Sequence, residues 1–390
     1  MAWDSIVGHG QQVRVLKTAL GTGRLAHAYL FAGPEGSGKE SVAFEIARIL
    51  NCSSPDATGD RGACGECESC RQAERFMHPN IEYLFPVEAV LLEPSDPSKK
   101  ENKKLTEAKE RYDALIEEKK RNPYFTPAME RSMGILTEQV VSLQQKASLA
   151  PREGGRKVFI ISQAERLHPS AANKLLKLLE EPPAHVVFIL VSSRPESVLP
   201  TIRSRCQLVS FQRVKPAELE AWISNSAAGV DETGRRFIAS FSRGNLRTAT
   251  ELLAGRSGEE SAPALVRLRD QAIDFLRNLL TPVRFHEAIA ACEEVARNLT
   301  RPEQLMFLGS LLLFFQDVAR RGASPSCPEL NNLDIAVSVD RFVKGFPARD
   351  LLRASTIVEE AMRSIERNAN VTLVMAGLAV ELKEVLGKGG

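Results

Sequence analysis

The feature that most constrains the fold is a glycine-rich loop near the N-terminus, with the sequence Gly33-Pro34-Glu35-Gly36-Ser37-Gly38-Lys39. An apolar run at residues 28–31 precedes the loop, and a helical pattern follows it. Between a strand and a helix, such a loop turns its backbone N–H groups toward phosphate oxygens, and its lysine reaches the outer phosphates. The sequence therefore predicts a phosphate-binding loop whose contact residues are Gly33, Gly36, Gly38 and Lys39.

The residue after Lys39 does not suit a magnesium-dependent ATPase. A Ser or Thr hydroxyl normally follows the lysine and binds Mg²⁺, but this chain has Glu40. A carboxylate at that position predicts repulsion of the phosphates by like charge. Ser41 comes one residue later, and on a helix this step turns its side chain away by roughly 100°. We expect an ATP site that has lost part of its chemistry.

A second apolar run supports that expectation. Residues 157–161 read as a buried parallel strand, after which a P-loop ATPase needs acidic residues for Mg²⁺ and for the attacking water. Here the chain gives Ser162 and Gln163, and the first carboxylate, Glu165, comes two residues late. The pattern favours a nucleotide-binding fold that does not hydrolyse. The alternative is an active ATPase in which Glu165 or another carboxylate holds the metal.

Cysteines form a second motif after the first helix. Cys64, Cys67 and Cys70 follow a CxxCxxC spacing, and Cys52 lies just upstream. Short turns can bring such thiolates to the metal distance of about 2.3 Å. All four positions are cysteine, which leaves no open coordination site, so the pattern predicts a structural Zn²⁺ site. The alternative is a reduced cluster without metal. His78 follows closely, and we expect it to cap or pack.

Composition excludes some classes of protein. The chain has 390 residues, a net charge of +2 and seven cysteines. This charge predicts no global attraction to DNA or to a membrane. The first residues lack a secretory signal pattern, and the longest apolar tract, at residues 305–315, is too short to span a bilayer. Clustered cysteines suit a reducing compartment. We expect a cytoplasmic protein with no membrane partner.

Residues 88–133 differ in character, because they are charged and poor in aromatic residues. Mixed charge at helical spacing predicts a solvated helix or hairpin inserted into the domain. Lys99, Lys100, Lys103 and Lys104 are candidates for a DNA contact, although glutamates interleave with them and stacking partners are few. An alternative function is therefore a zinc-bearing nucleic-acid-binding module that uses this insert.

The remaining pattern is a third strand followed by helices. Residues 186–191 read as a buried strand that ends in Ser192 and Ser193, which we expect to face the ligand crevice. Helices are expected at 137–150 and 171–179, and helical segments run from 212 to a linker at 255–261. Beyond it, we expect helices at 264–280, 285–298, 303–320 and 351–386, the last with a break near Ala369-Asn370.

Several of these motifs together resemble a known family. They are the strand His27-Ala28-Tyr29-Leu30-Phe31, the phosphate loop, the four-cysteine insert, His78-Pro79-Asn80, the stretch Ala172-Asn173-x-Leu-Leu-Lys-x-Leu-Glu-Glu-Pro-Pro and the triplet Ser204-Arg205-Cys206. This set, within residues 1–250, resembles the bacterial clamp-loader subunits of DNA polymerase III, an AAA+ family. The resemblance implies an α/β AAA+ P-loop module with a parallel sheet, flanking helices and a four-Cys zinc insert. It also implies a small helical lid and an all-α C-terminal collar domain.

The resemblance implies a division of the chain into domains. The AAA+ domain would span residues 1–211, with a zinc module at about 52–80 and a charged insert at about 88–133. The helical lid would span 212–256. The oligomerisation collar would span 262–390, where the apolar residues 311–315 would suit a contact between subunits.

The family also implies roles for single residues. Arg205 would project into the ATP site of a neighbouring subunit and stabilise the γ-phosphoryl group, with Arg203 as a structural or salt-bridging neighbour. Arg247, in the lid, would touch the phosphates of a bound nucleotide. ATP or ADP would bind without hydrolysis at Gly33, Gly36, Gly38, Lys39, Ser41 and Arg247.

Two kinds of subunit share these motifs. Active tau/gamma-like ATPases keep Lys-Thr and Asp-Glu at the two nucleotide motifs, whereas other members have degenerate motifs. Glu40, Ser162 and Gln163 fit the degenerate kind, with the active kind as the alternative. The implied partners are the tau/gamma and delta subunits and, through the complex, the sliding clamp and primed DNA.

Overall fold

The structure is a computed structural model that describes residues 3, 6–93, 103–152, 155–227, 230, 232–254, 264–324, 330–345 and 350–387. The chain forms two compact units. The first extends through Trp222 and includes Arg243–Thr250, and the second combines Ile223–Ser242 with the chain from Glu251 onward. The expected lid is thus divided between the units, and its boundaries stay a prediction. The expected linker at 255–261, together with Lys99 and Lys100, lies outside the described residues.

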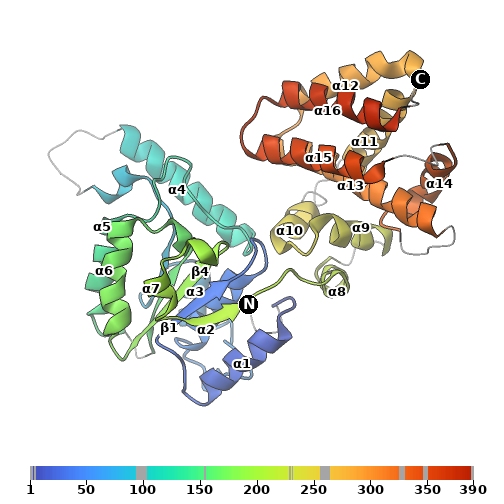
Figure 1. The fold of residues 1–390 in the computed structure, drawn as a ribbon. Coiled ribbons are helices and arrows are strands. Elements are labelled where there is room, and N and C mark those ends of the chain that lie inside the picture. The colour runs from blue at the N-terminus through green and yellow to red at the C-terminus, as the bar shows by residue number, and fades with distance from the viewer. Residues whose placement is uncertain are drawn as a thin grey trace. The chain divides into compact units, whose positions relative to one another are not determined.

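The first unit is built on a parallel five-stranded sheet with the order β2-β3-β4-β1-β5. Figure 1 labels β1 and β4 of this sheet. Its strands are β1 (Ala28–Ala32), β2 (Ile81–Leu84), β3 (Lys157–Ile161), β4 (Val186–Ser192) and β5 (Gln207–Ser210). The three central strands are wholly buried, as their continuous apolar sequences predict for a parallel sheet covered on both faces. The edge strands β2 and β5 were not predicted, because they are short and only partly buried.

Helices cover both faces of this sheet. They are α1 (Gly10–Gly21), α2 (Lys39–Ile49), α3 (Glu68–Glu74), α5 (Thr137–Ala147), α6 (Pro169–Glu180) and α7 (Pro200–Arg203). Leu30 and Phe188 belong to the core on the α5 and α6 face, whereas Phe31 and Val187 belong to the core on the α1 and α2 face. This alternation along the strands is the normal side-chain period of two. The predicted fold class, a parallel α/β sheet with flanking helices, is confirmed.

The charged insert contains one long helix, α4 (Lys103–Arg121), which packs against the short 3₁₀ turn η2 (Ala89–Leu92). The helix is predominantly solvated, in agreement with its mixed charge. Its two buried residues are Ala108 and Lys119. Ala108 joins a small core with Phe85, but a buried lysine in a solvated helix needs a specific partner.

The helices of the second half of the chain are α8 (Pro216–Ser226), α9 (Glu232–Ser242), α10 (Leu246–Ala254), α11 (Ala264–Leu280), α12 (Phe285–Asn298), α13 (Arg301–Ala323), α14 (Ala336–Gly345), α15 (Leu351–Glu366) and α16 (Val371–Leu386). The predicted break near Ala369-Asn370 is confirmed, because α15 ends before it and α16 begins after it. The Asn370 side chain accepts the Leu373 N–H and thereby caps α16.

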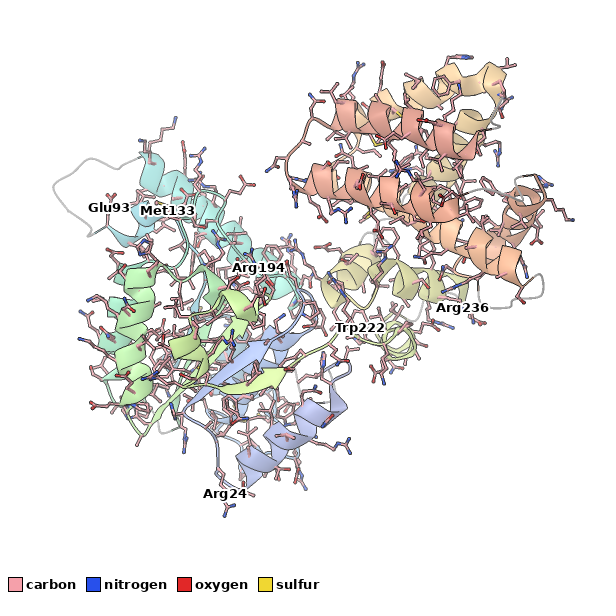
Figure 2. All side chains as sticks on the ribbon, in the orientation of Figure 1. Arg24, Glu93, Met133, Arg194, Trp222 and Arg236 are labelled. Atoms are coloured by element: carbon pink, nitrogen blue, oxygen red, sulfur yellow. The ribbon has the colours of Figure 1, made fainter. Side chains whose placement is uncertain are left out.

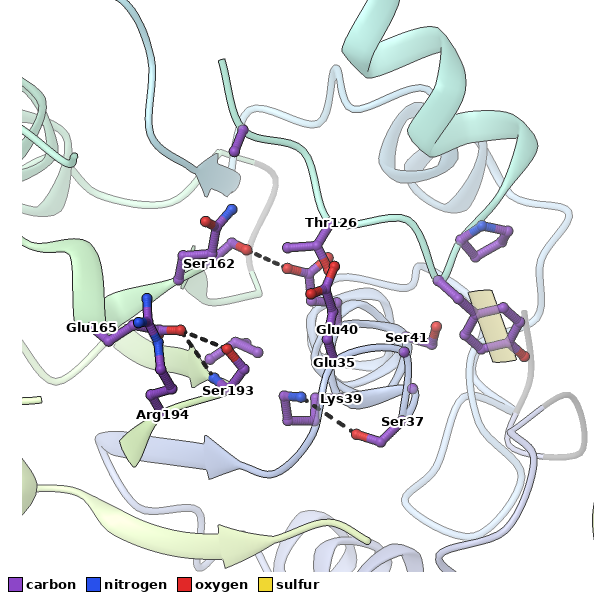
Figure 3. A pocket seen from close by; sticks show the side chains of 17 residues that line it. Glu35, Ser37, Lys39, Glu40, Ser41, Thr126, Ser162, Glu165, Ser193 and Arg194 are labelled. Atoms are coloured by element: carbon purple, nitrogen blue, oxygen red, sulfur yellow. Dashed lines mark hydrogen bonds between the residues drawn. The ribbon is translucent and has the colours of Figure 1, made fainter. Parts of the chain in front are cut away.

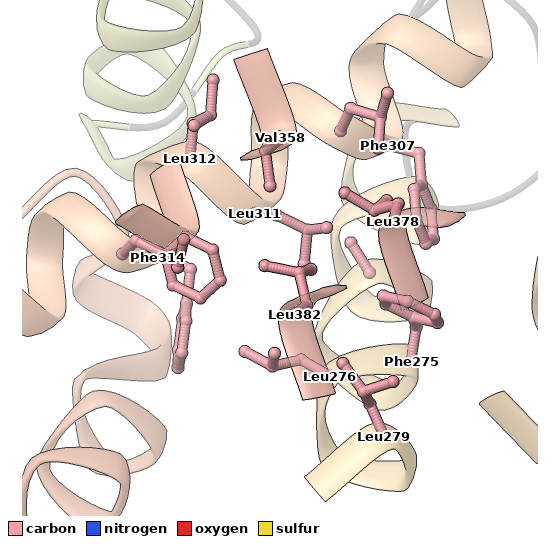
Figure 4. Close-up of a cluster of buried hydrophobic side chains, with 14 of the residues drawn as sticks. Phe275, Leu276, Leu279, Phe307, Leu311, Leu312, Phe314, Val358, Leu378 and Leu382 are labelled. Carbon is pink, nitrogen blue, oxygen red and sulfur yellow. The ribbon is translucent and has the colours of Figure 1, made fainter. Parts of the chain in front are cut away.

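The apolar tract at residues 305–315 is compatible in sequence with a core helix or with a contact between subunits, and the structure shows the core helix. The apolar residues 311–315 of α13 were expected to suit a contact between subunits, but none of them is more than 2% exposed. They lie in the core of their own unit with side chains of α11, α15 and α16 (Figure 4). Because α13 packs against both α11 and α15, its apolar residues are buried within the chain. Among the described residues, no helix is both long and apolar enough to cross a membrane.

Candidate functional site

A cavity of about 350 Å³ lies where β1, β3 and β4 end. Figure 3 shows the side chains that line it. They come from the phosphate loop, from residues 123–128 after α4, and from the segments that follow β3 and β4. Ligands of parallel α/β sheets bind at the carboxyl ends of the strands, so the cavity lies where the sequence predicts the crevice.

The phosphate loop adopts a conformation that requires glycine. Gly36 has a φ of 70°, and an added Cβ would lie 1.7 Å from the Asn245 Oδ1 atom. The same segment closes onto the loop, because the Leu246 N–H donates to the Gly36 carbonyl at 2.8 Å. Gly38, at φ 89°, directly precedes α2. The loop, its glycines and the helix start are therefore arranged as the sequence predicts.

Lys39 and Ser41 both line the cavity. The Lys39 Nζ donates to the Gly33 carbonyl at 2.7 Å and the Pro34 carbonyl at 2.6 Å. Burial lowers its pKa to about 8, and the nearby Glu40 and Glu165 carboxylates oppose that shift. Ser41 is 4% exposed, and its Oγ has no hydrogen-bond partner among the described residues. Both side chains can therefore serve an anion that enters the cavity.

Glu40 is neutralised within the protein. Its carboxylate accepts hydrogen bonds from the Lys119 ammonium, from the Ser162 hydroxyl and from the Tyr83 hydroxyl, the last at 2.9 Å. The Glu40 side chain is 7% exposed and the Lys119 side chain 1% exposed. The sequence led us to expect a carboxylate that crowds the phosphates with like charge. The structure corrects this expectation, since Glu40 forms a buried ion pair.

Lys119 is the functional residue that sequence analysis missed. It lies in the last turn of α4, within a run of lysines and glutamates that reads as solvated surface. Its ammonium also donates to the Pro123 carbonyl at 2.8 Å and the Phe125 carbonyl at 2.6 Å. Burial lowers the Lys119 pKa, and Glu40 opposes that shift. The one available signal was Glu40 itself, because a buried carboxylate requires a cation.

Among the described residues, no carboxylate of the segment after β3 contacts Glu40 or Lys119. Ser162 is wholly buried and bonded to Glu40, and the Gln163 Nε2 donates to the Pro127 carbonyl at 2.9 Å. Glu165 turns to the neighbouring strand end, where it accepts from the Ser193 N–H at 3.2 Å and hydroxyl at 2.7 Å. Ser193 thus faces the crevice as predicted, whereas Ser192 is buried and is not part of the lining. Arg194, labelled on the whole chain in Figure 2 and in the cavity in Figure 3, also lines the cavity.

Arg247 lies at the edge of the phosphate loop. Its guanidinium forms an ion pair with Glu35 at 3.1 Å and stacks over the Phe125 ring with 4.7 Å to the ring centroid. These two contacts join the loop to the segment after α4. The arginine therefore lies near the site where the family resemblance expects it, although its present partner is a carboxylate.

The four cysteines of the predicted metal site come together. Their sulfur atoms all lie within 4.8 Å of one another. The Sγ atoms of Cys52 and Cys64 are 3.5 Å apart, and those of Cys64 and Cys70 are 3.9 Å apart. A tetrahedral ion with Zn–S bonds of about 2.3 Å needs sulfur separations of about 3.8 Å. The thiol set therefore fits a four-coordinate metal ion with no position left open.

Backbone groups support this cluster. The Cys67 N–H points to the Cys64 sulfur at 3.4 Å, and the Cys70 N–H points to the Cys67 sulfur at 3.4 Å. Such donors stabilise thiolates around a metal. His78 bonds instead to the Ser69 hydroxyl at 2.9 Å and the Asn80 N–H at 3.1 Å. It has the packing and capping role that the sequence predicts.

Arg205 lies outside the cavity lining, two residues after the end of α7. Its guanidinium contacts the Glu180 carboxylate at 2.7 Å and donates to the Thr201 carbonyl at 2.9 Å. Its side chain is 35% exposed. Arg203 is exposed. In the described part of the chain, Arg205 is the one of these two arginines that forms an ion pair. The structure brings Lys39 and Ser41 to one cavity, pairs Arg247 with the lining residue Glu35, and leaves Arg205 on the surface.

Comparison with known proteins gives one matching family model, described as DNA polymerase III, delta subunit, over residues 8–215. The chain is 25% identical over 379 residues to DNA polymerase III subunit delta' of Bacillus subtilis, covering 95% of each chain. It is 32% identical over 223 residues to DNA polymerase III subunit gamma/tau of Mycobacterium tuberculosis, covering 57% of this chain and 31% of the relative. A gamma subunit-related protein of Thermotoga maritima aligns at 14% identity over 96% of this chain and 99% of its own, with a TM-score of 0.40.

Proposed function

The chain belongs to the DNA polymerase III delta family, as a clamp-loader subunit of the delta-prime kind, and from this premise we propose that it does not hydrolyse ATP itself. Instead, it binds a nucleotide passively and supplies Arg205 to the ATP site of a neighbouring subunit. The proposal concerns the chemistry of two places, the cavity at the phosphate loop and the surface around Arg205.

The observation that carries the proposal is the buried contact between Glu40 and Lys119. An ATPase needs a hydroxyl after the loop lysine and a carboxylate after the second strand, which together hold Mg²⁺ near the phosphates. Here Glu40 and Ser162 stand at those positions, and the Glu40 carboxylate accepts hydrogen bonds from both the Ser162 hydroxyl and the Lys119 ammonium. Catalytic geometry tolerates displacements of only about 1 Å. A Glu165 carboxylate bonded to Ser193 therefore makes a poor substitute.

The cavity supports passive nucleotide binding. Its loop is preformed, and Lys39 and Ser41 line it, while Arg247 is tied to the loop residue Glu35. Phosphates can use the backbone N–H groups and the start of α2. We infer that ATP or ADP binds here and is not turned over.

Arg205 is suited to act outside its own chain. It is partly exposed and its ion-pair partner Glu180 is 49% exposed, so water weakens the pair and a stronger anion can replace the carboxylate. An arginine finger is worth about 10³ to 10⁵ in rate at the site that it serves. We infer that the γ-phosphoryl group of a neighbouring subunit's ATP is that anion.

The remaining assignments follow from the family. The partners are the tau/gamma and delta subunits, and the assembly places the sliding clamp on primed DNA in the cytoplasm. The second unit supplies the oligomerisation collar at residues 262–390, with the lid at 212–256. Cys52, Cys64, Cys67 and Cys70 hold a structural Zn²⁺ that braces the first unit after α2.

The experiment is steady-state ATP hydrolysis by the complex reconstituted with tau/gamma, delta, clamp and primed DNA. Arg205→Ala should lower ATP turnover by the fraction that the ATP site served by Arg205 contributes to the total. Arg203→Ala is the matched control. Both variants should fold, because both arginines lie at the surface. Turnover that stays unchanged in Arg205→Ala would remove the proposed role in trans.

An active ATPase remains the rival, since one relative is a gamma/tau subunit and Glu165 lines the cavity. Hydrolysis by the isolated chain decides this question. We expect none. Turnover that Lys39→Ala abolishes would make this chain a motor subunit that uses Glu165.

A further inference from the structure

The charged insert places one buried cation directly behind Glu40, which lines the phosphate cavity. Lys119 ends α4, and its ammonium donates to Glu40 and to the carbonyls of Pro123 and Phe125. An ammonium group has three N–H donors, so every donor has an acceptor within the protein. Lys119 is therefore a fixed internal cation and is not a mobile surface lysine.

The acceptors identify the place that this cation occupies. Glu40 stands where a P-loop has its magnesium-binding hydroxyl, and Ser162 stands where the second strand has its magnesium-binding carboxylate. The Ser162 hydroxyl donates to one oxygen of the Glu40 carboxylate, and the Lys119 ammonium donates to the other. Tyr83 completes the set by donating its hydroxyl to Glu40 at 2.9 Å. The positions that would hold a metal instead hold a lysine.

We propose that the Glu40–Lys119 ion pair takes up the magnesium-binding positions, so that the cavity binds the polyphosphate of a nucleotide without Mg²⁺. This inference rests on the passive nucleotide binding proposed above and names the form in which the ligand is bound. It also gives the insert a role, which is to carry a built-in cation to the phosphate loop.

Mg²⁺ has little left to bind in this arrangement. It requires oxygen ligands at about 2.0 to 2.1 Å in near-octahedral geometry. The Glu40 oxygens already accept three hydrogen bonds, and the adjacent ammonium repels a second cation. Glu165 is the remaining carboxylate in the lining. One of its oxygens accepts from Ser193, and the other has no hydrogen-bond partner among the described residues.

The same cavity offers groups for an anion without metal. Lys39 and Arg194 supply positive charge to the lining, and Ser41 supplies a buried hydroxyl that has no partner among the described residues. The backbone N–H groups of the loop and the start of α2 add further donors. The ligand class is a nucleoside diphosphate or triphosphate, recognised through its phosphates.

Titration calorimetry of the full chain with ADP tests the inference, once in EDTA and once in excess Mg²⁺. We expect the affinity in EDTA to equal or exceed that in Mg²⁺. A loss of about tenfold or more in EDTA, equal to about 1.4 kcal/mol, would overturn the inference. Failure to bind ADP in either buffer would overturn it too, because Lys119 would then only close the cavity.

A double variant makes the test sharper. Glu40→Thr with Lys119→Met removes both charges of the pair together, so neither charge remains buried alone, and it restores a hydroxyl next to Lys39. ADP binding by this variant should become about tenfold tighter in Mg²⁺ than in EDTA. The matched control is Lys146→Met, which removes a lysine from the partly exposed pair with Glu82 and should keep the metal-independent affinity.

The clamp-loader role is measured separately. Stimulation of the reconstituted complex depends on Arg205, which does not line this cavity. If that stimulation persists while ADP binding requires Mg²⁺, the metal-free inference fails and the proposed function stands. If ADP binds equally well in both buffers but Arg205→Ala has no effect, the role in trans fails and this inference stands.

Discussion

The cysteine cluster and the phosphate cavity lie in the same unit, but they are assembled in different ways. The cluster takes its ligands from one short stretch between Cys52 and Cys70, and backbone N–H groups of that stretch point to the sulfurs. The decisive contact of the cavity joins Glu40 to Lys119, 79 residues apart. One site is local in sequence, and the other depends on the folding of an insert.

The two sites also balance charge differently. Four cysteine sulfurs lie within 4.8 Å of one another, and as thiolates they would repel each other without a cation between them, so the proposed site requires an external ion. The cavity has its own cation, because Lys119 neutralises Glu40. The difference predicts that metal removal damages the cluster and leaves the cavity unaffected.

The largest effect should come from loss of the metal. Cys67→Ala removes one ligand, and a structural Zn²⁺ site contributes folding free energy directly, so we expect several kcal/mol of lost stability and no bound zinc. Metal analysis of the purified chain and thermal denaturation measure both quantities. The control is Cys206→Ala, a cysteine outside the cluster, which should keep one zinc per chain. An unchanged zinc content in Cys67→Ala would contradict the four-ligand site.

The next largest effect should come from breaking the buried pair. Lys119→Met leaves the Glu40 carboxylate buried without its cation and should cost about 3 to 5 kcal/mol of unfolding free energy. Glu40→Gln with Lys119→Met should cost less than Lys119→Met alone, because no charge is left unpaired. Denaturant titration of the wild-type chain, both single variants and the double variant gives the coupling. A double variant that is less stable than Lys119→Met would show that the two charges do not stabilise each other.

These two sites also show what the sequence could reveal. The cysteine spacing and the phosphate loop are local patterns whose chemistry depends on a few neighbouring residues, and both were predicted. The central strands were predicted because burial on both faces makes them continuously apolar. Lys119 could not be found, since its neighbours in α4 are solvated and nothing nearby marks it as buried. The edge strands β2 and β5 are short and partly exposed. Their sequences therefore lack the continuous apolar run that marked the central strands.

A smaller effect should appear in the pH dependence of anion binding. Burial lowers the pKa of Lys39 to about 8, and Glu40, Glu165, Glu35 and Arg213 are the charged groups that act on it. Above pH 8 the ligand-free protein loses this charge, so ADP affinity should fall about tenfold from pH 7 to pH 9. Calorimetry in EDTA measures this change. Lys39→Met should bind weakly at both values.

The same pKa shift affects stability in the opposite direction. The unfolded chain keeps Lys39 protonated up to its ordinary pKa of 10.5, so between pH 8 and 10.5 it binds more protons than the folded chain. The contribution of Lys39 to the unfolding free energy therefore rises with pH across that window. A ligand affinity that does not change between pH 7 and pH 9 would mean that the phosphates do not reach Lys39.

The smallest effect should come from the partly exposed ion pair between Arg205 and Glu180. Arg205 and Glu180 approach to 2.7 Å, but their side chains are 35% and 49% exposed, so Glu180→Gln should change the unfolding free energy by less than about 1 kcal/mol. Denaturant titration measures this change against the buried pair in the same unit. A small value means that Arg205 can leave Glu180 at little cost and turn to a phosphate. A loss above about 2 kcal/mol would mean that Arg205 is held in place by its own chain, and a finger role would then require a partner that breaks this pair first.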